Sequence, residues 1–266
     1  MAHAKLAPSS ISRVIRCPGS AIPNAEAPNT SSFPAARGTA IHEMCEQLLK
    51  DRLDGITLSD YWLGRTVELE GFAIEIGKEE IDIAETYVNY IRQRTEELNG
   101  KLLIEEKLYL TEISEDCWGT ADAVILGEGN RMVVADLKSG NYPVNVSKSS
   151  PIGTYINEQL LTYSLGALNR WGNENTVIEM TIIQPSKRSF HKDGPIRSFD
   201  IQALDLVDWG FNILKPACEE ALGENPSFHA YASLDESVKE HTEDWCRFCA
   251  YKPDCLTFQK HQEGEK

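Results

Sequence analysis

Two aspartates and one lysine have the types and the spacing of a metal-dependent hydrolytic site. Asp136 and Lys138 end an apolar run, and Asp122 precedes Asp136 by 136 − 122 = 14 residues. Residues two apart on a strand point to the same face, so Asp136 and Lys138 should lie side by side, and a hairpin could bring Asp122 beside them. Neighbouring carboxylates repel each other unless a cation lies between them, and their oxygens suit Mg²⁺ or Mn²⁺.

Such a site would supply what phosphodiester hydrolysis needs. A divalent metal polarises the phosphodiester and lowers the pKa of a bound water, and a nearby lysine stabilises the charge that develops on the phosphate. Taken alone the pattern is weak, because an aspartate at the end of a strand is also a common cap. The motifs around it therefore have to be considered with it.

Three further polar residues flank the acidic motif. His42 lies early on a predicted helix, shares a face with Glu46, and could supply a further metal ligand. Gln159 and Tyr163 share a face of the helix predicted after the motif. Each has an ordinary alternative, namely a solvent-facing histidine and a polar helix face with one packing tyrosine.

The cysteines suggest a second metal site near the end of the chain. Three of the seven form the compact pattern Cys246-x-x-Cys249-x5-Cys255, and Cys17, 246 − 17 = 229 residues upstream, is the best candidate for a fourth ligand. Thiolates held close together repel each other without a metal. A bound metal would relieve that repulsion and tie the two ends together. Cys45, Cys117 and Cys218 are instead expected to be small buried apolar residues.

Hydrophobic periodicity predicts the elements that position these residues. An early segment broken by prolines precedes two helices, three strands, a crossover helix, two strands and a final helix. This order indicates an α/β fold with a central mixed β-sheet flanked by helices. The predicted helices cover 39–52, 72–98, 154–171 and 201–222, and the predicted strands cover 102–110, 118–126, 131–138, 176–184 and 195–199.

Four motifs together resemble the RecB-type branch of the PD-(D/E)XK nucleases: Gly-Thr-x-x-His, Gly-x-x-Asp, Asp-x-Lys and Gln-x-x-x-Tyr, in that order. The resemblance implies a single nuclease domain over residues 1–266, with a restriction-endonuclease-like core of about 37–200. It implies metal binding by His42, Asp122, Asp136 and the carbonyl of Leu137, catalysis by Lys138, and DNA positioning by Gln159 and Tyr163. Glu43 and Glu46 would be helpers.

The split cysteine pattern resembles the iron–sulfur members of the same superfamily, the AddB-like and CRISPR-associated RecB-like exonucleases. It implies a [4Fe–4S] cluster on Cys17, Cys246, Cys249 and Cys255, in a staple region formed by 1–36 and 201–266. Zinc is the alternative occupant, since four thiolates also suit that ion. The N-terminal Ser-x4-Cys-Pro-Gly pattern resembles phage and prophage proteins of this group.

Composition limits the ways in which the chain could bind DNA. It has 266 residues and a net charge of −15, which counts against passive binding of long duplex DNA. Single-stranded or frayed ends are the expected partners, with Lys148, Lys187 and Arg188 as candidate phosphate contacts. No stretch is apolar enough to suggest a membrane span, so a cytoplasmic protein is expected. There is no Walker-type loop, so a helicase partner would be a separate protein.

The predicted activity is therefore a Mg²⁺- or Mn²⁺-dependent deoxyribonuclease, an exonuclease that processes DNA ends in recombination, repair or phage DNA metabolism. One alternative is a non-catalytic module that binds DNA ends or a protein partner and keeps the nuclease fold and the cluster. Another is a zinc-stapled protein without a nucleic-acid function.

Overall fold

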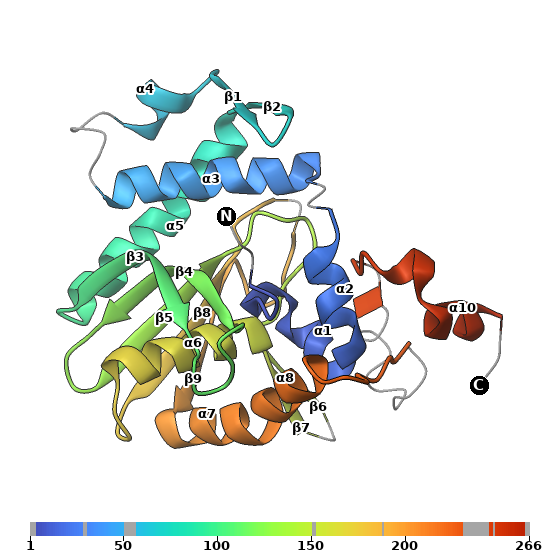
Figure 1. The fold of residues 1–266 in the computed structure, drawn as a ribbon. Helices are drawn as coiled ribbons and strands as arrows, with labels where there is room; N and C mark the ends of the chain where they lie inside the picture. The colour runs from blue at the N-terminus through green and yellow to red at the C-terminus, as the bar shows by residue number, and fades with distance from the viewer. Residues whose placement is uncertain are drawn as a thin grey trace.

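A five-stranded mixed sheet forms the centre of the fold in the computed structural model, which describes residues 4–28, 31–50, 57–150, 153–187, 189–230, 245–246 and 248–263. The strand order is β3-β4-β5-β8-β9; β5 and β8 run parallel, and the other neighbours are antiparallel. The predicted α/β class is confirmed (Figure 1). The strands are β3 (Lys101–Tyr109), β4 (Trp118–Leu126), β5 (Arg131–Leu137), β8 (Val177–Ile183) and β9 (Ile196–Gln202).

The helix α6 (Glu158–Trp171) connects the two parallel strands, which need a crossover. It begins at Glu158 because the side chain of Asn157 accepts a hydrogen bond from Leu160 N at 3.1 Å. The predicted start at 154 is wrong. The preceding residues instead pair as β6 (Ser147–Ser150) and β7 (Gly153–Ile156), whose backbone hydrogen bonds go to each other.

Two long helices, α3 (Phe33–Leu49) and α5 (Lys78–Glu97), lie across the opposite face of the sheet from α6 (Figure 1). The predicted helix 39–52 starts too late, because Ser32 caps α3 and Pro34 occupies its first turn, where no backbone N–H is needed. The predicted helix 72–98 is wrong at its start. Residues 66–75 form the hairpin of β1 (Thr66–Leu69) and β2 (Phe72–Glu75).

The turn of that hairpin explains the error. Glu70 and Gly71 both have positive φ, 52° and 83°, which suits a tight two-residue β-turn. Gly77 then separates β2 from α5, whose N-terminus is closed by Glu80 Oε2 accepting from Gly77 N at 3.0 Å. A short helix, α4 (Leu58–Trp62), lies just before the hairpin.

Short helices from both chain ends gather beside α6. The predicted helix 201–222 is confirmed in type; its α7 and α8 are joined by one turn of wider π geometry at Gly210–Leu214. The tail lies beside α1 and α2 (Figure 1). These elements are η1 (Pro8–Ser10), α1 (Ile11–Arg16), η2 (Pro18–Ser20), α2 (Ala21–Glu26), α7 (Ala203–Trp209), α8 (Lys215–Ala221), η6 (Lys252–Asp254) and α10 (Leu256–Gln262).

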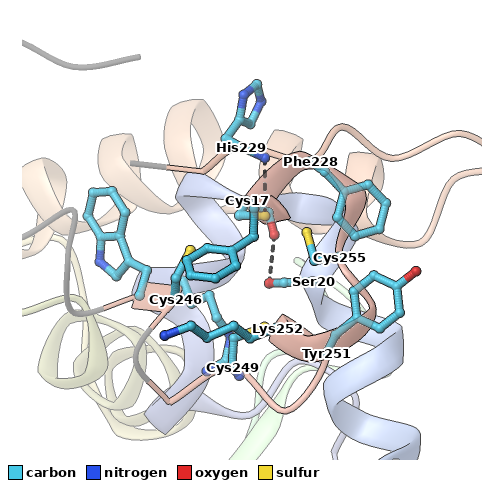
Figure 2. Close-up of a pocket in the computed structure, with 12 residues that line it drawn as sticks. Cys17, Ser20, Phe228, His229, Cys246, Cys249, Tyr251, Lys252 and Cys255 are labelled. Carbon is cyan, nitrogen blue, oxygen red and sulfur yellow. Dashed lines mark hydrogen bonds between the residues drawn. The ribbon is translucent and has the colours of Figure 1, made fainter. Parts of the chain in front are cut away.

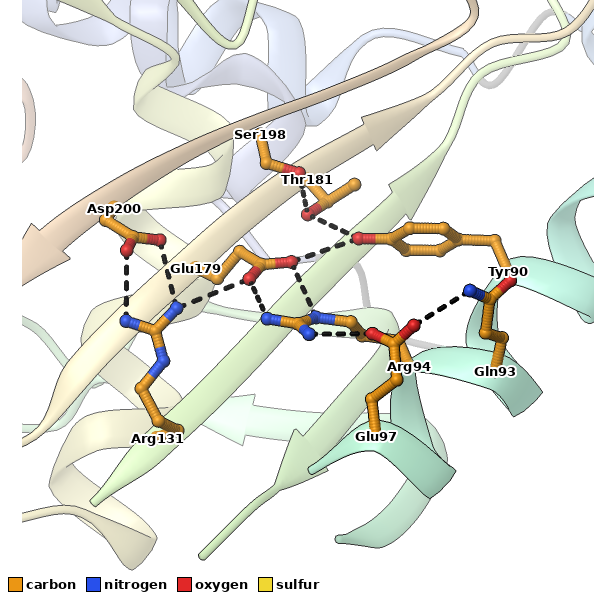
Figure 3. Close-up of polar contacts among 9 residues, drawn as sticks. All are labelled: Tyr90, Gln93, Arg94, Glu97, Arg131, Glu179, Thr181, Ser198 and Asp200. Carbon is orange, nitrogen blue, oxygen red and sulfur yellow. Dashed lines mark hydrogen bonds and ion pairs between the residues drawn. The ribbon is translucent and has the colours of Figure 1, made fainter. Parts of the chain in front are cut away.

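A buried ionic network joins α5 to the sheet (Figure 3). The carboxylate of Glu179 on β8, 7% exposed, accepts hydrogen bonds from Arg94 at 3.2 and 2.5 Å and from the hydroxyl of Tyr90 at 3.0 Å. Arg131 approaches the same carboxylate at 3.4 Å and also pairs with Asp200 at 3.0 Å. The charge of Glu179 is therefore compensated from two elements, as burial requires.

Candidate functional site

Three carboxylates lie in one row across neighbouring strands. In the β3–β4 register, Ile104 pairs with Ala123 and Glu106 with Ala121, which places Glu105 opposite Asp122. In the β4–β5 register, Ala123 pairs with Ala135, and one step further Asp122 lies opposite Asp136. The pairing of the strands therefore brings together residues from three separate parts of the sequence.

In β3 and β4, the alternation of side chains between the two faces of the sheet is interrupted at this row. Ile104 packs in the core under α3 and α5, whereas Leu108 packs in the core under α6, although regular alternation would put both on one face. Ala121 and Ala123 on β4 divide between the two cores in the same way. Glu105 has φ of 53°, a strained conformation for this residue type. The irregularity turns the carboxylates of β3 and β4 toward the α3 side.

His42 on α3 completes this side of the site. Its Nδ1 lies 3.3 Å from Asp122 Oδ1, and the backbone N–H of Leu137 donates to Asp122 Oδ2 at 2.7 Å. One candidate metal-binding group among the described residues consists of His42, Glu105 and Asp122, whose ligand atoms lie within 4.8 Å of one another. Sequence reasoning singled out His42 and Asp122 but missed Glu105, whose position depends on strand register.

Asp136 and Lys138 form a second half of the site, with Gln159 from α6. The ammonium Nζ of Lys138 lies 2.8 Å from Asp136 Oδ2 and donates to Gln159 Oε1 at 2.9 Å. Gln159 Nε2 donates to Asp136 Oδ1 at 3.1 Å. The predicted shared face of Asp136 and Lys138 is confirmed by this contact. Asp136 is 4% exposed, and the group that surrounds His42 takes Glu105 rather than Asp136.

Tyr163 follows Gln159 by one helical turn and is 8% exposed. Burial and the charge of Asp136 raise the pKa of Tyr163, and a hydrogen bond with Gln159 opposes that rise. Gly119 on β4 packs so closely that an added Cβ would lie 3.1 Å from the Tyr163 ring. Tyr163 is thus a packed residue behind Gln159, and DNA positioning by the pair stays a prediction.

The charges of the site depend on one another. Burial opposes ionisation of His42, but the Asp122 carboxylate outweighs burial and raises the pKa of His42 to about 9. Burial likewise opposes ionisation of Asp122, yet His42 and the Leu137 N–H hold its pKa below the ordinary value. Burial, followed by the charge of Asp122, raises the pKa of Glu105 to about 7. Burial also raises the pKa of Asp136, against the pull of Lys138.

An open groove leads to these residues between α3 and the segment that follows β5. The groove holds about 720 Å³ of space, a volume that includes its open, solvent-filled mouth. Gly38 allows the close approach of the two walls, because a Cβ at this position would lie 3.1 Å from Ser139 Oγ. The groove is lined by Pro34, Ala35, Gly38, Thr39, His42, Leu137, Lys138, Ser139 and Gly140.

The four cysteines singled out from the sequence line one pocket (Figure 2). Cys17 directly follows α1, and the other three come from residues 246–255. Figure 2 shows Cys17, Cys246, Cys249 and Cys255 around a common space, with Phe228 and Tyr251 beside them. Cys17 accepts from His229 N at 3.3 Å. Within the described part of the chain, no three of these sulfurs lie within 4.8 Å of one another.

Polar side chains connect the cysteine pocket to its surroundings. Asn24 Nδ2 donates to Cys249 Sγ at 3.1 Å, and Asn24 Oδ1 accepts from Ala250 N at 2.8 Å. Arg16, next to Cys17 in the chain, lies 4.5 Å from the ring centre of Trp245 and forms a 2.5 Å ion pair with Glu158 at the start of α6. Arg16 therefore links Trp245, which lines the pocket, to the first turn of α6, where Gln159 of the acidic site also lies.

The remaining predicted residues fall into three groups: cysteines, basic residues and glutamates. Cys45, Cys117 and Cys218 are buried in the apolar cores, as expected. Lys148 and Lys187 are exposed, and a role in contacting DNA stays a prediction, whereas Arg188 lies outside the described residues. Glu46 pairs with Lys50 at 2.8 Å, and Gln47 donates to Glu43 at 3.2 Å.

Comparison with known proteins assigns a family without an activity. The chain belongs to a family of proteins of unknown function, DUF2800, whose profile matches residues 3–265. The solved structure of SSO0001 is also similar, at 16% sequence identity and a TM-score of 0.33, covering 92% of this chain and 84% of that one. Where the chain is described, no helix is both long and apolar enough to span a bilayer.

Proposed function

We propose that this chain is a divalent-metal-dependent deoxyribonuclease with the site architecture of the RecB-like PD-(D/E)XK enzymes. One observation carries the proposal: the ammonium of Lys138, 2.8 Å from Asp136, borders the same groove as His42, and His42 contacts Asp122 at 3.3 Å. The pairing of β4 with β5 supports the proposal because it brings Asp122 opposite Asp136, two residues that the sequence motifs also name.

The donor atoms suit Mg²⁺ or Mn²⁺. Glu105 and Asp122 offer carboxylate oxygens, which both ions prefer, and His42 adds a nitrogen that suits Mn²⁺ better than Mg²⁺. Asp136 Oδ2 is buried and accepts no hydrogen bond of good geometry among the described residues, although Lys138 is close. Asp136, opposite Asp122 in register, and the carbonyl of Leu137 therefore stay predicted ligands.

The chain's own residues divide the work of hydrolysis. A bound metal would polarise the phosphodiester and activate a water molecule. Lys138, held between Asp136 and Gln159, presents a positive charge where the phosphate gains negative charge during attack. His42 must lose its proton before it can bind a metal, so metal binding displaces the ion pair with Asp122.

The decisive experiment compares two lysines. Full-length protein is incubated with end-labelled DNA in Mn²⁺, Mg²⁺ or EDTA. Lys138→Ala should lower the cleavage rate on the order of 10²–10³-fold or more, whereas Lys101→Ala, which changes an exposed lysine at the start of β3, should leave it within a few-fold. Cleavage by Lys138→Ala at the rate of the unaltered protein would refute the site.

The same assay separates the wider parts of the proposal. DNA substrates with blocked 5′ or 3′ ends test whether the enzyme is an exonuclease that processes ends in recombination, repair or phage DNA metabolism. If the unaltered protein binds DNA ends but cuts none in any metal, the alternative of a non-catalytic end-binding module holds. We also propose a cytoplasmic location, and a helicase or recombination protein as a partner.

We further propose a [4Fe–4S] cluster in the cysteine pocket. Zinc is the alternative occupant, since four thiolates suit that ion as well. The feature that favours the cluster is the split arrangement, in which Cys17 joins three cysteines that lie more than 200 residues further along the sequence and line the same pocket. Arg13 lies close enough to Cys249, Cys17 and Cys246 to interact with their charge, and Asn24 donates to a sulfur, as ligands of such clusters commonly require.

Iron and sulfide analysis of anaerobically purified protein tests the cluster. We expect about four irons and four sulfides per chain and a brown colour. Cys249→Ser should lose both and lower the melting temperature, while Cys45→Ser, in the α3–α5 core, should retain the iron. One zinc per chain with no iron would overturn the assignment.

A further inference from the structure

The sheet face next to the metal site carries an aromatic pair, of which Tyr109 is exposed and Trp118 half-buried, with a lysine above it. Tyr109 on β3 and Trp118 on β4 are paired in register, with ring centres 6.3 Å apart and planes inclined by 38°. Lys107 Nζ lies 3.9 Å from the Trp118 ring centre and 5.1 Å from that of Tyr109. Tyr109 is 54% exposed and Lys107 is also exposed, so this surface is open to solvent.

These three side chains face away from α6. Leu108, between Lys107 and Tyr109, packs under α6, where it lies 3.0 Å from an added Cβ at Gly166. Gly119, next to Trp118, likewise faces Tyr163 of α6. Because neighbours on a strand point to opposite faces, Lys107, Tyr109 and Trp118 lie on the α3 side of the sheet.

The metal site opens on that same side. His42 reaches Asp122 from α3, and Glu105 precedes Lys107 by two residues and Tyr109 by four. At about 3.3 Å per residue, Tyr109 is roughly 13 Å along β3 from Glu105, a distance that a few nucleotides of an extended strand can span. The change of face at Glu105 therefore places the aromatic pair and the carboxylates on one continuous surface.

We propose that Lys107, Tyr109 and Trp118 form a stacking platform for single-stranded DNA, beside the scissile phosphate. Bases stack on aromatic rings without regard to sequence, and a lysine above the rings can contact the phosphate between two bases. Such a surface needs little positive charge, which fits a chain whose net charge is −15. The proposal rests on the proposed nuclease function and adds the class of substrate and the surface that holds it.

A matched pair elsewhere on the molecule provides the control. Phe211, 42% exposed, also lies beneath a lysine, with Lys215 Nζ 5.4 Å from its ring centre. It belongs to the turn between α7 and α8, on the other side of the sheet (Figure 1). Loss of this ring removes a comparable cation–aromatic contact without touching the proposed platform.

The experiment measures binding and cleavage separately. Variants Tyr109→Ala, Tyr109→Phe, Lys107→Ala and Phe211→Ala are made in the full chain carrying Lys138→Ala, and oligothymidylate and blunt duplex DNA are titrated in Ca²⁺. The same variants without Lys138→Ala are assayed with Mn²⁺ on a small chromogenic phosphodiester that is too short to reach Tyr109, and on oligothymidylate.

Tyr109→Ala should raise the Kd for oligothymidylate on the order of ten-fold, Tyr109→Phe should restore most of the affinity, and Phe211→Ala should change nothing. Lys107→Ala should reduce the salt dependence of binding by about 0.7 in log–log slope. Cleavage of the small diester should be unaffected. If Tyr109→Ala binds oligothymidylate with unchanged affinity and the small diester is still cleaved, the platform is refuted but the nuclease function is not. A protein that cleaves neither substrate would instead refute the nuclease function.

Discussion

Glu105 should act in opposite directions in the metal-free and the metal-bound protein. Replacing it by Gln removes a negative charge that lies beside Asp122, and it also removes one of three grouped ligand atoms. Without metal, the loss of repulsion should stabilise the fold. With metal, the loss of a ligand should weaken binding. A residue that merely packs in the sheet would produce only one of these effects.

The size of the metal-free effect follows from the pKa of Glu105. Burial and the charge of Asp122 raise this pKa from 4.5 to about 7. A raised pKa contributes stability that is fully present below pH 4.5 and is lost as the pH rises through about 7. The difference between the ordinary and the raised pKa of Glu105 corresponds to about 3 kcal/mol in the free energy of unfolding. Solvent screening of this part-exposed group reduces that effect to roughly 1–2 kcal/mol. For a chain of this length, Glu105→Gln should then raise the Tm at pH 8 by about 2–4 °C.

Thermal unfolding in EDTA at pH 4 and pH 8, followed by Mn²⁺ titration, tests both effects. Glu105→Gln should be more stable than the unaltered protein at pH 8 and close to it at pH 4, and its Mn²⁺ affinity should fall on the order of 100-fold. Glu106→Gln is the matched control, because that neighbour pairs with Arg170 at the surface. A Glu105→Gln protein with unchanged Mn²⁺ affinity and no gain in stability at pH 8 would contradict the assignment of Glu105 to the metal site.

Two further predictions concern the supports of the site. Glu179→Gln should destabilise the fold by about 2–3 kcal/mol and lower the Tm by about 4–6 °C, because it leaves Arg94 poorly paired. Glu97→Gln, which removes the surface partner of Arg94, should change the Tm little. Equal shifts in the two variants would show that burial of Glu179 is unimportant. Arg16→Ala should lower the melting temperature by several degrees and speed the loss of iron on exposure to air, since it leaves Glu158 unpaired and removes the contact with Trp245. Retention of iron at the rate of the unaltered protein, measured by absorbance, would contradict that link.

The sheet was predictable because its signals are local. Strand β4 has the predicted bounds, Trp118–Leu126, and Asp136 and Lys138 meet as strand periodicity requires. Helix starts were harder to predict, because the cap at Ser32 depends on a side-chain contact that no periodicity reports. The β1–β2 hairpin was missed because its turn, Glu70-Gly71, lacks the usual asparagine or aspartate before glycine.

Glu105 could not have been found from local pattern. An apolar run, Leu102-Leu103-Ile104, precedes it and the charged pair Glu106-Lys107 follows it, and nothing in these residues indicates a positive φ of 53°. Its role depends on pairing with Asp122, seventeen positions away by 122 − 105, and on a helix that presents His42 from another part of the chain. The cysteine set, by contrast, was predictable because Cys246, Cys249 and Cys255 are closely spaced in the sequence, and they line one pocket together with Cys17; the metal in that pocket stays a prediction.

The row of carboxylates is set by strand register, so the number of residues between Asp122 and Asp136 has no chemical meaning of its own. That number is fixed by the turn 127–130, which is exposed at Glu128, Gly129 and Asn130. A longer turn would leave Asp122 opposite Asp136, because the pairing of Ala123 with Ala135 would be unchanged. Searches for related sites should therefore let this gap vary in length. Within this turn, Gly129 is the place to insert a tag or fluorophore, because Glu128 and Asn130 form backbone hydrogen bonds with Leu98 and Val177.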